Sequence, residues 1–154
     1  MHIALVENGL PITAAVGLPD LGVVFHSDDV KAVLGPLSRN IVVSHNRAPA
    51  VAHHIADKFG FETTKMGSAG AKAMHVLLGD ADAYVHAGGQ YEWDSAAPVG
   101  VCTAAGLHCS RLDGSPLTYN NKDTYLPDIL ICRPELADDM LEAAAGFLEE
   151  NGSY

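Results

Sequence analysis

The chain has 154 residues, of which 48% are hydrophobic and 18% charged, and its formal net charge at pH 7 is −10. These values exclude a disordered chain and predict a single globular domain over residues 1–154 with a sizeable core. The acidic balance argues against a nucleic-acid polymer as partner, because such partners need a basic face. No apolar run approaches the roughly 18 residues of a membrane span, so no membrane partner is expected.

Cysteine usage and the first residues point to a cytoplasmic protein. Cys102, Cys109 and Cys132 are an odd number without the close spacing of a metal or redox motif, and each lies among apolar neighbours. We therefore expect reduced thiols in the core. Residues 1–7 lack the basic segment and the cleavage site of a secretory signal peptide.

The opening of the chain predicts an antiparallel meander. Residues 2–7 and 10–16 are expected strands that flank Asn8-Gly9, a dipeptide that favours the tight turn of a hairpin. A third strand is predicted near 22–26, after a turn that contains Pro19.

From Ile41 onward, predicted strands alternate with predicted helices. Pro49 near the start of the first helix and Gly60 at its end are typical of helix boundaries. This alternation predicts a layered α/β arrangement. The expected strands are 41–44, 61–65, 81–87, 107–112 and 128–132, and the expected helices are 48–59, 69–78, 94–105 and 135–149.

The segment 67–72, with the sequence GSAGAK, has the composition of an anion site. It combines a glycine-rich entry, the capping hydroxyl of Ser68 and the ammonium of Lys72 in the first turn of a helix. Free backbone N–H groups and the helix dipole attract an anion at such a place, and a lysine adds a full charge. The alternative is a well-capped helix that uses small residues for close packing.

The segment 44–49, with the sequence SHNRAP, lies where a strand meets a helix. Ligands of open α/β sheets collect at the carboxyl ends of strands. Arg47 is suited to bidentate binding of a phosphate, and His45 is suited to stacking on a base or hydrogen-bonding to it. The alternatives are a surface arginine and a turn histidine.

Asp94 is expected at the start of the helix 94–105, where an anion is favoured by about 0.3–1 kcal/mol. A carboxylate there can hold Mg²⁺ together with a phosphate-bearing substrate. The alternative is that Asp94 is simply the N-cap of this helix. Asp80 and Asp82 flank a helix–strand turn and are expected to be solvated.

Three segments together carry a resemblance to a known family: residues 67–72, residues 82–98 and the tail 126–134. They resemble the inositol monophosphatase superfamily, and within it most closely the CysQ-type 3′(2′),5′-bisphosphate nucleotidases of actinobacteria. The resemblance runs from about His2 to Arg133. The family's other two metal motifs, an N-terminal Glu-Glu and an Asp-Pro-x-Asp-Gly-Thr loop, are absent. The resemblance thus implies the C-terminal half of an α-β-α-β-α sandwich.

The function that this resemblance implies is Mg²⁺-dependent hydrolysis of a phosphomonoester. The implied substrate is 3′-phosphoadenosine 5′-phosphate or its sulfated relative, an adenosine bisphosphate-type small molecule of sulfate assimilation and nucleotide recycling. Asp94 corresponds to the one metal ligand present, and the catalytic residues stay unknown because the upstream motifs are missing. Ser68 and Lys72 correspond to residues that face the sugar and the non-scissile phosphate, and His45 to one that contacts the adenosine.

Position 86 separates two substrate classes within the superfamily. Inositol phosphatases have an acidic residue there that binds inositol hydroxyls, whereas this chain has His86, a further expected substrate-binding residue. Three hypotheses follow: a nucleotidase that is inactive or nearly so as this 154-residue chain, a non-catalytic nucleotide-binding remnant, and an inositol or fructose-bisphosphate phosphatase relative. The meander would leave an unpaired edge, which a homodimer or the missing N-terminal half is expected to cover.

Overall fold

The computed structural model describes residues 1–154. It contains two β-sheets, four α-helices (α1 to α4) and two short 3₁₀ turns (η1 and η2). The strands are β1 (His2–Glu7), β2 (Leu10–Leu18), β3 (Val23–His26), β4 (Asn40–Ser44), β5 (Glu62–Met66), β6 (Ala83–Tyr91), β7 (His108–Ser110) and β8 (Tyr125–Cys132). The helical elements are η1 (Pro19–Leu21), α1 (Ala50–Phe59), α2 (Ala69–Leu78), α3 (Glu92–Ala104), η2 (Pro134–Leu136) and α4 (Ala137–Asn151).

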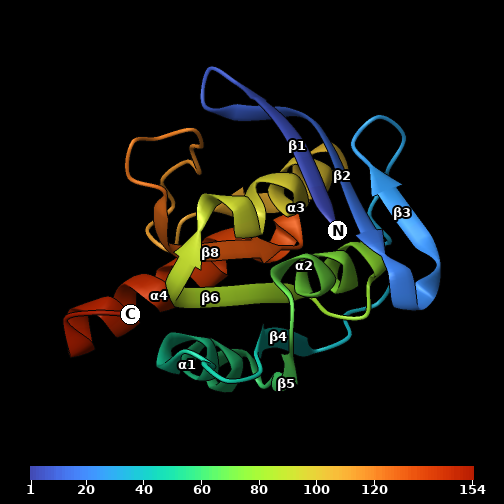
Figure 1. The fold of residues 1–154 in the computed structure, drawn as a ribbon. Coiled ribbons are helices and arrows are strands. Elements are labelled where there is room, and N and C mark those ends of the chain that lie inside the picture. The colour runs from blue at the N-terminus through green and yellow to red at the C-terminus, as the bar shows by residue number, and fades with distance from the viewer.

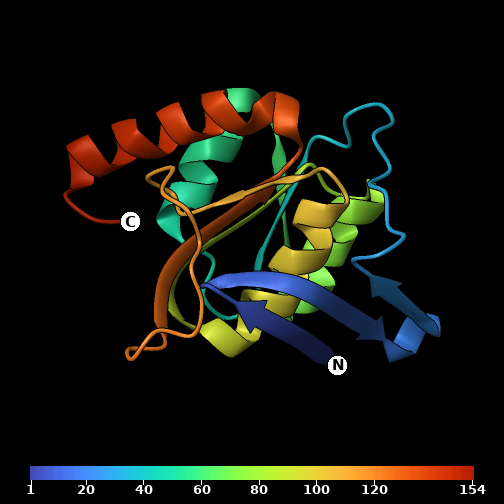
Figure 2. The same ribbon diagram turned by 90° about the horizontal axis from the view of Figure 1, so that it is seen from above.

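The elements form layers of helices and sheets (Figure 1). The five-stranded sheet has the order β5-β4-β6-β8-β7, and the three-stranded antiparallel sheet has the order β1-β2-β3. Seen from above, α1 and α4 cover one face of the larger sheet, α2 and α3 cover its other face, and β1 to β3 lie outside α2 and α3 (Figure 2). The predicted α/β class, a short antiparallel meander followed by alternating strands and helices, is confirmed.

The meander forms where the local sequence predicts it. Asn8 and Gly9 both have positive φ, at 51° and 80°, the conformation that a tight two-residue hairpin turn requires. The turn pairs β1 with β2 from Glu7↔Leu10 back to His2↔Val16. Strand β1 is the edge of this sheet, and its Ile3 and Leu5 side chains are exposed.

The pleat of the central strands divides the core between the two faces of the five-stranded sheet. Ile41 and Val43 pack in the cluster with α1 and α4, whereas Val42 between them packs in the cluster with α2 and α3. Successive side chains of a strand point to opposite faces, so a continuous apolar run suits a strand buried on both sides. Tyr84 lies on the α2 and α3 side.

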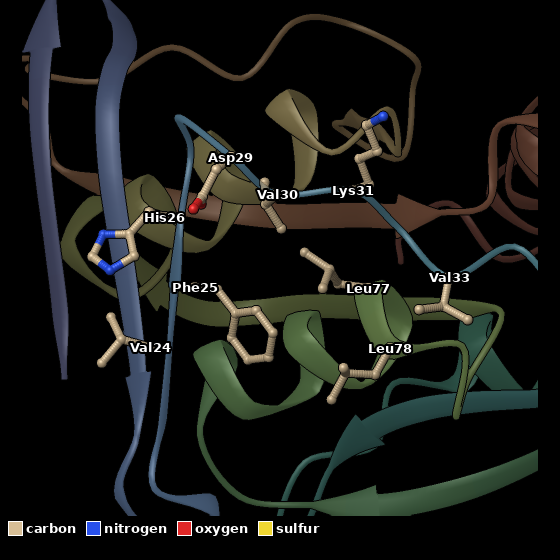
Figure 3. Close-up of a pocket in the computed structure, with 9 residues that line it drawn as sticks. All are labelled: Val24, Phe25, His26, Asp29, Val30, Lys31, Val33, Leu77 and Leu78. Atoms are coloured by element: carbon tan, nitrogen blue, oxygen red, sulfur yellow. The ribbon is translucent and has the colours of Figure 1, made fainter.

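The segment after β3 crosses the C-terminal end of α2 (Figure 3). Phe25 and Val30 pack against the cluster that contains Leu77, and these side chains border an apolar hollow of about 260 Å³. This contact ties the meander and the segment after it to α2. No helix of the structure is both long and apolar enough to cross a membrane.

Several element boundaries differ from those predicted, and the largest difference is at β6. This strand does not end at Ala87 but continues to Tyr91, because it stays paired with β8 as far as Tyr91↔Tyr125. Gly88 and Gly89, at φ 78° and 71°, make an irregularity in the ladder without ending it. As a result, α3 begins at Glu92 and not at residue 94.

The other differences are small and have local causes. Helix α1 begins at Ala50 rather than at Ala48, because a residue before proline is disfavoured in the α region and Pro49 itself is extended. Strand β8 begins at Tyr125, strand β7 covers only His108–Ser110, and a 3₁₀ turn precedes α4. All three cysteines are free; Cys102 and Cys132 are buried, and Cys109 is partly exposed.

The expectation that Asp82 is solvated is wrong. Its side chain is fully buried, its carboxylate accepts hydrogen bonds from the backbone N–H groups of Ser38 (3.2 Å) and Arg39 (2.6 Å), and it lies 3.6 Å from the Arg133 guanidinium. A buried carboxylate is tolerated when it is paired and hydrogen-bonded in this way. Asp80 is exposed as expected and pairs with His75 at 3.2 Å.

Candidate functional site

A polar hollow of about 220 Å³ lies beyond the carboxyl end of β4, over the second half of β6, between the first turns of α2 and α3. Ala69 and Tyr84 are its only hydrophobic lining residues. The hollow brings together five of the six predicted site residues, leaving out His45. Its lining is Ser44, Arg47, Ser68, Ala69, Lys72, Tyr84, His86, Gly89, Gln90 and Asp94.

The first turn of α2 forms one wall. Ser68 is the N-cap, and its hydroxyl accepts a hydrogen bond from the Ala71 N–H at 3.3 Å. Lys72 is buried one turn further on, where its ammonium donates to the Ser68 carbonyl at 3.1 Å and lies 5.0 Å from the centre of the Tyr84 ring. Burial lowers the pKa of Lys72 to about 8, although the negative charge of Asp94 acts in the opposite direction.

Strand β6 forms the floor of the hollow. His86 is 5% exposed, and neither of its ring nitrogens has a hydrogen-bond partner. Gln90 is 3% exposed; its Nε2 donates to the Tyr84 hydroxyl at 3.1 Å, while its Oε1 has no partner. Burial lowers the pKa of His86, and the nearby charges of Lys72 and Arg47 lower it further, whereas the Gly88 backbone and the charge of Asp94 act in the opposite direction. The net result is a lowered pKa, which favours the neutral imidazole.

Arg47 reaches the hollow from the loop between β4 and α1. Its guanidinium donates to the Gly89 carbonyl at 3.4 Å. A Cβ atom at Gly89 would collide with this guanidinium, so the glycine allows the arginine to lie over the strand. Arg47 forms no ion pair, and neither does Lys72, although the chain as a whole is strongly acidic.

Asp94 comes from the first turn of α3 and not from the position before it. The N-cap of α3 is Tyr91, and Asp94 is the third helical residue, whose Oδ2 accepts a hydrogen bond from the Tyr91 N–H at 3.0 Å. The alternative that Asp94 is the N-cap is therefore wrong in position, although its carboxylate does stabilise the helix start. Its other oxygen, Oδ1, forms no hydrogen bond.

The residues around the hollow do not by themselves fit a magnesium centre. Asp94 is the only carboxylate in the lining, and no group of three or more His, Cys, Asp or Glu side chains is placed to hold a metal ion. Glu92 is unavailable, because its carboxylate accepts hydrogen bonds from the backbone N–H groups of Asn120 (2.7 Å) and Asn121 (3.1 Å). Two-metal phosphatase sites need several converging oxygen ligands, and here there is one.

His45 is exposed and does not line the hollow; its backbone N–H donates to the Met66 carbonyl at 3.1 Å. The structure adds five lining residues that were not predicted as site residues: Ser44, Ala69, Tyr84, Gly89 and Gln90. The period of two along β6 offered a signal for Tyr84, because it shares a strand face with His86. No comparable signal marked Gln90, since the irregularity at the two glycines alters the alternation.

The family model for the inositol monophosphatase family matches residues 1–146. The chain belongs to this family. Proteins named 3′-phosphoadenosine 5′-phosphate phosphatase, from Mycobacterium bovis and Mycobacterium tuberculosis, are each 54% identical to it over 94% of the chain. The Escherichia coli K12 protein named 3′(2′),5′-bisphosphate nucleotidase CysQ is 30% identical over 82% of it.

Solved structures of family members share this fold. The inositol monophosphatase from Anabaena matches with a TM-score of 0.73 at 20% identity, covering 94% of this chain and 63% of its own. That from Zymomonas mobilis matches with a TM-score of 0.73 at 18% identity, covering 94% and 61%. The chain spans 58% of the length of the mycobacterial relatives and 56% of the Escherichia coli one.

Proposed function

We propose that the chain provides the nucleotide-binding part of a Mg²⁺-dependent 3′(2′),5′-bisphosphate nucleotidase. The proposed reaction is hydrolysis of the 3′-phosphate of 3′-phosphoadenosine 5′-phosphate, or of its sulfated form, which gives AMP or adenosine phosphosulfate plus phosphate. The names of the relatives at 54% identity support this substrate. With it we propose a cytoplasmic role in sulfate assimilation.

The observation that carries the proposal is the convergence of two cationic side chains on one hollow, neither of which forms an ion pair. Lys72 and Arg47 line one hollow together with the N-terminus of α2, and neither side chain has an ion pair within the chain. Helix N-termini and cationic side chains bind phosphate groups, and an arginine adds a planar fork of donors. The phosphate groups of a bisphosphate nucleotide can pair with both cations.

Turnover requires more than these residues. Asp94 is the single carboxylate at the hollow, and the magnesium chemistry of the proposed reaction needs additional oxygen ligands. The 154-residue chain on its own therefore binds the nucleotide without hydrolysing it efficiently. The lone carboxylate is also the observation that favours the second candidate function, nucleotide binding without catalysis.

The test measures binding and hydrolysis on the same purified chain. Isothermal titration calorimetry with 3′-phosphoadenosine 5′-phosphate is expected to show binding, and Lys72→Met is expected to weaken it about tenfold or more, because a charged hydrogen bond contributes about 1.5–3 kcal/mol. Inositol 1-phosphate and fructose 1,6-bisphosphate serve as comparison ligands. Tighter binding of either would contradict the nucleotide assignment.

Hydrolysis is measured as phosphate release at millimolar Mg²⁺, with Asp94→Asn as the matched variant. This substitution keeps an oxygen for the Tyr91 N–H but removes the charge. Release close to background is expected from both proteins. Rapid release by the unaltered chain, lost in Asp94→Asn, would show that other carboxylates of this chain complete the metal site.

A further inference from the structure

Gln90 is buried in the floor of the hollow, and the carbonyl oxygen of its side-chain amide has no hydrogen-bond partner. Its Nε2 donates to the Tyr84 hydroxyl at 3.1 Å, and its Oε1 has no hydrogen-bond partner although the residue is 3% exposed. Leaving a buried acceptor unpaired costs about 1–3 kcal/mol, and buried polar atoms in native structures are nearly always paired. An unpaired buried acceptor on a residue that lines a hollow indicates that a bound ligand supplies its hydrogen-bond donor.

The bond to Tyr84 sets the kind of partner that Gln90 accepts. Because Nε2 donates to the tyrosine, the carbonyl oxygen is the atom of the amide that has no partner within the chain, and Gln90 lines the hollow. Tyr84 is itself about 1% exposed and packed in the core, so the amide is held on a rigid support. A carbonyl oxygen pairs with a hydrogen-bond donor and repels the oxygens of an ionised phosphate, which have no hydrogen to give.

The size and lining of the hollow indicate which part of a nucleotide lies there. At about 220 Å³ it is smaller than the roughly 300–1,000 Å³ of pockets that enclose drug-sized ligands. Its lining is polar, with the cations of Lys72 and Arg47 on the walls. These properties suit a phosphorylated sugar better than an adenine ring, which needs apolar faces. A sugar offers hydroxyl donors beside its phosphates.

We propose that Gln90 determines sugar specificity: its Oε1 accepts a hydrogen bond from the free ribose hydroxyl next to the phosphate of the bound nucleotide. In 3′-phosphoadenosine 5′-phosphate this is the 2′-hydroxyl, the only sugar hydroxyl left unmodified. Tyr84 acts as a positioning residue that fixes the orientation of the amide. The inference rests on the proposed nucleotide-binding function and adds the group by which a ribonucleotide is distinguished from a deoxyribonucleotide.

The experiment compares the affinities of the 154-residue chain for 3′-phosphoadenosine 5′-phosphate and 2′-deoxyadenosine 3′,5′-bisphosphate by calorimetry. The chain is expected to bind the ribonucleotide about three- to tenfold more tightly, the factor for one neutral hydrogen bond. Gln90→Leu is expected to bind the two ligands equally, because its side chain accepts no hydrogen bond. Tyr84→Phe keeps the amide but removes the hydroxyl that orients it. Its discrimination between the two ligands is therefore expected to lie between that of the unaltered chain and that of Gln90→Leu.

Asn40→Leu is the matched control, since it makes a similar amide-to-leucine change at the opposite end of β4, outside the hollow. It is expected to keep the full discrimination. Equal affinities of the unaltered chain for both ligands, or discrimination that survives in Gln90→Leu, would overturn the role of Gln90 while leaving nucleotide binding intact. Absence of binding by either nucleotide would instead contradict the proposed function itself.

Discussion

Buried polar side chains lie near both ends of β6, but only those near its start have hydrogen-bond partners for all of their polar atoms. At the start of the strand, the Asp82 carboxylate has two backbone N–H donors and lies beside the Arg133 guanidinium. Towards its end, both nitrogens of His86 and the Oε1 of Gln90 have no partner. Asp82 directly precedes the strand, His86 and Gln90 lie within it, and all three side chains are buried.

This difference separates a structural cluster from the proposed ligand site. A buried charge with complete hydrogen bonding holds its neighbours in place and has no capacity for a ligand. Buried donors and acceptors without partners destabilise the free protein, and a ligand that pairs them recovers that free energy on binding. Burial alone therefore does not support a binding role, whereas unsatisfied hydrogen-bonding groups beside cations that form no ion pair support the proposed ligand site.

The largest effect, on the free energy of unfolding, is expected at Asp82. Asp82→Ala leaves the Ser38 and Arg39 N–H groups without an acceptor and Arg133 without its buried partner, so the free energy of unfolding should fall by about 3–5 kcal/mol. Urea unfolding followed by circular dichroism measures it. Asp80→Ala, at an exposed position two residues earlier, is the control and should cost less than about 1 kcal/mol. Similar losses for both variants would show that the cluster does not hold the fold together.

An intermediate effect is expected from the pH dependence of ligand binding at the other end. The pKa of Lys72 is lowered to about 8, so its ammonium is mostly protonated at pH 7 and mostly neutral at pH 9. The phosphate groups of the nucleotide are already ionised over this range, since their second pKa is about 6. Affinity for 3′-phosphoadenosine 5′-phosphate should therefore fall about tenfold from pH 7 to pH 9. In Lys72→Met the affinity should be low at both pH values, and an equal decline there would assign the titration to another group.

The smallest effect on stability is expected at His86, whose ring nitrogens have no partners. His86→Leu removes a buried ring whose nitrogens have no partners, so the free energy of unfolding should stay within about 1 kcal/mol of the original value or rise. Nucleotide affinity should fall in the same variant. Thermal unfolding with and without 3′-phosphoadenosine 5′-phosphate tests both statements together. A large loss of stability would mean that His86 serves the fold in the way that Asp82 does.

Local sequence rules predicted much of the fold because the features concerned depend on a few adjacent residues. Asn8-Gly9 supplies the positive φ of the hairpin, and Ser68 supplies the cap of α2. Gly60 ends α1 in the left-handed conformation that glycine adopts without strain. The motif in which Ser68 lies four residues before Lys72 predicted an anion site, and the structure places both side chains at the hollow, although their role in binding stays a prediction.

Only the tertiary structure decided which polar residues are buried and whether they are paired. The donors to Asp82 lie 43 and 44 residues earlier in the sequence, so no local pattern distinguishes it from the exposed Asp80. The length of β6 depends on pairing with β8, which carries the strand past two glycines that locally favour a break. Gln90 belongs to the site for the same reason. Its place in the hollow and its free acceptor follow from contacts between segments that are far apart in the sequence. Whether a buried polar atom has a partner depends on those contacts, so it cannot be predicted from local sequence.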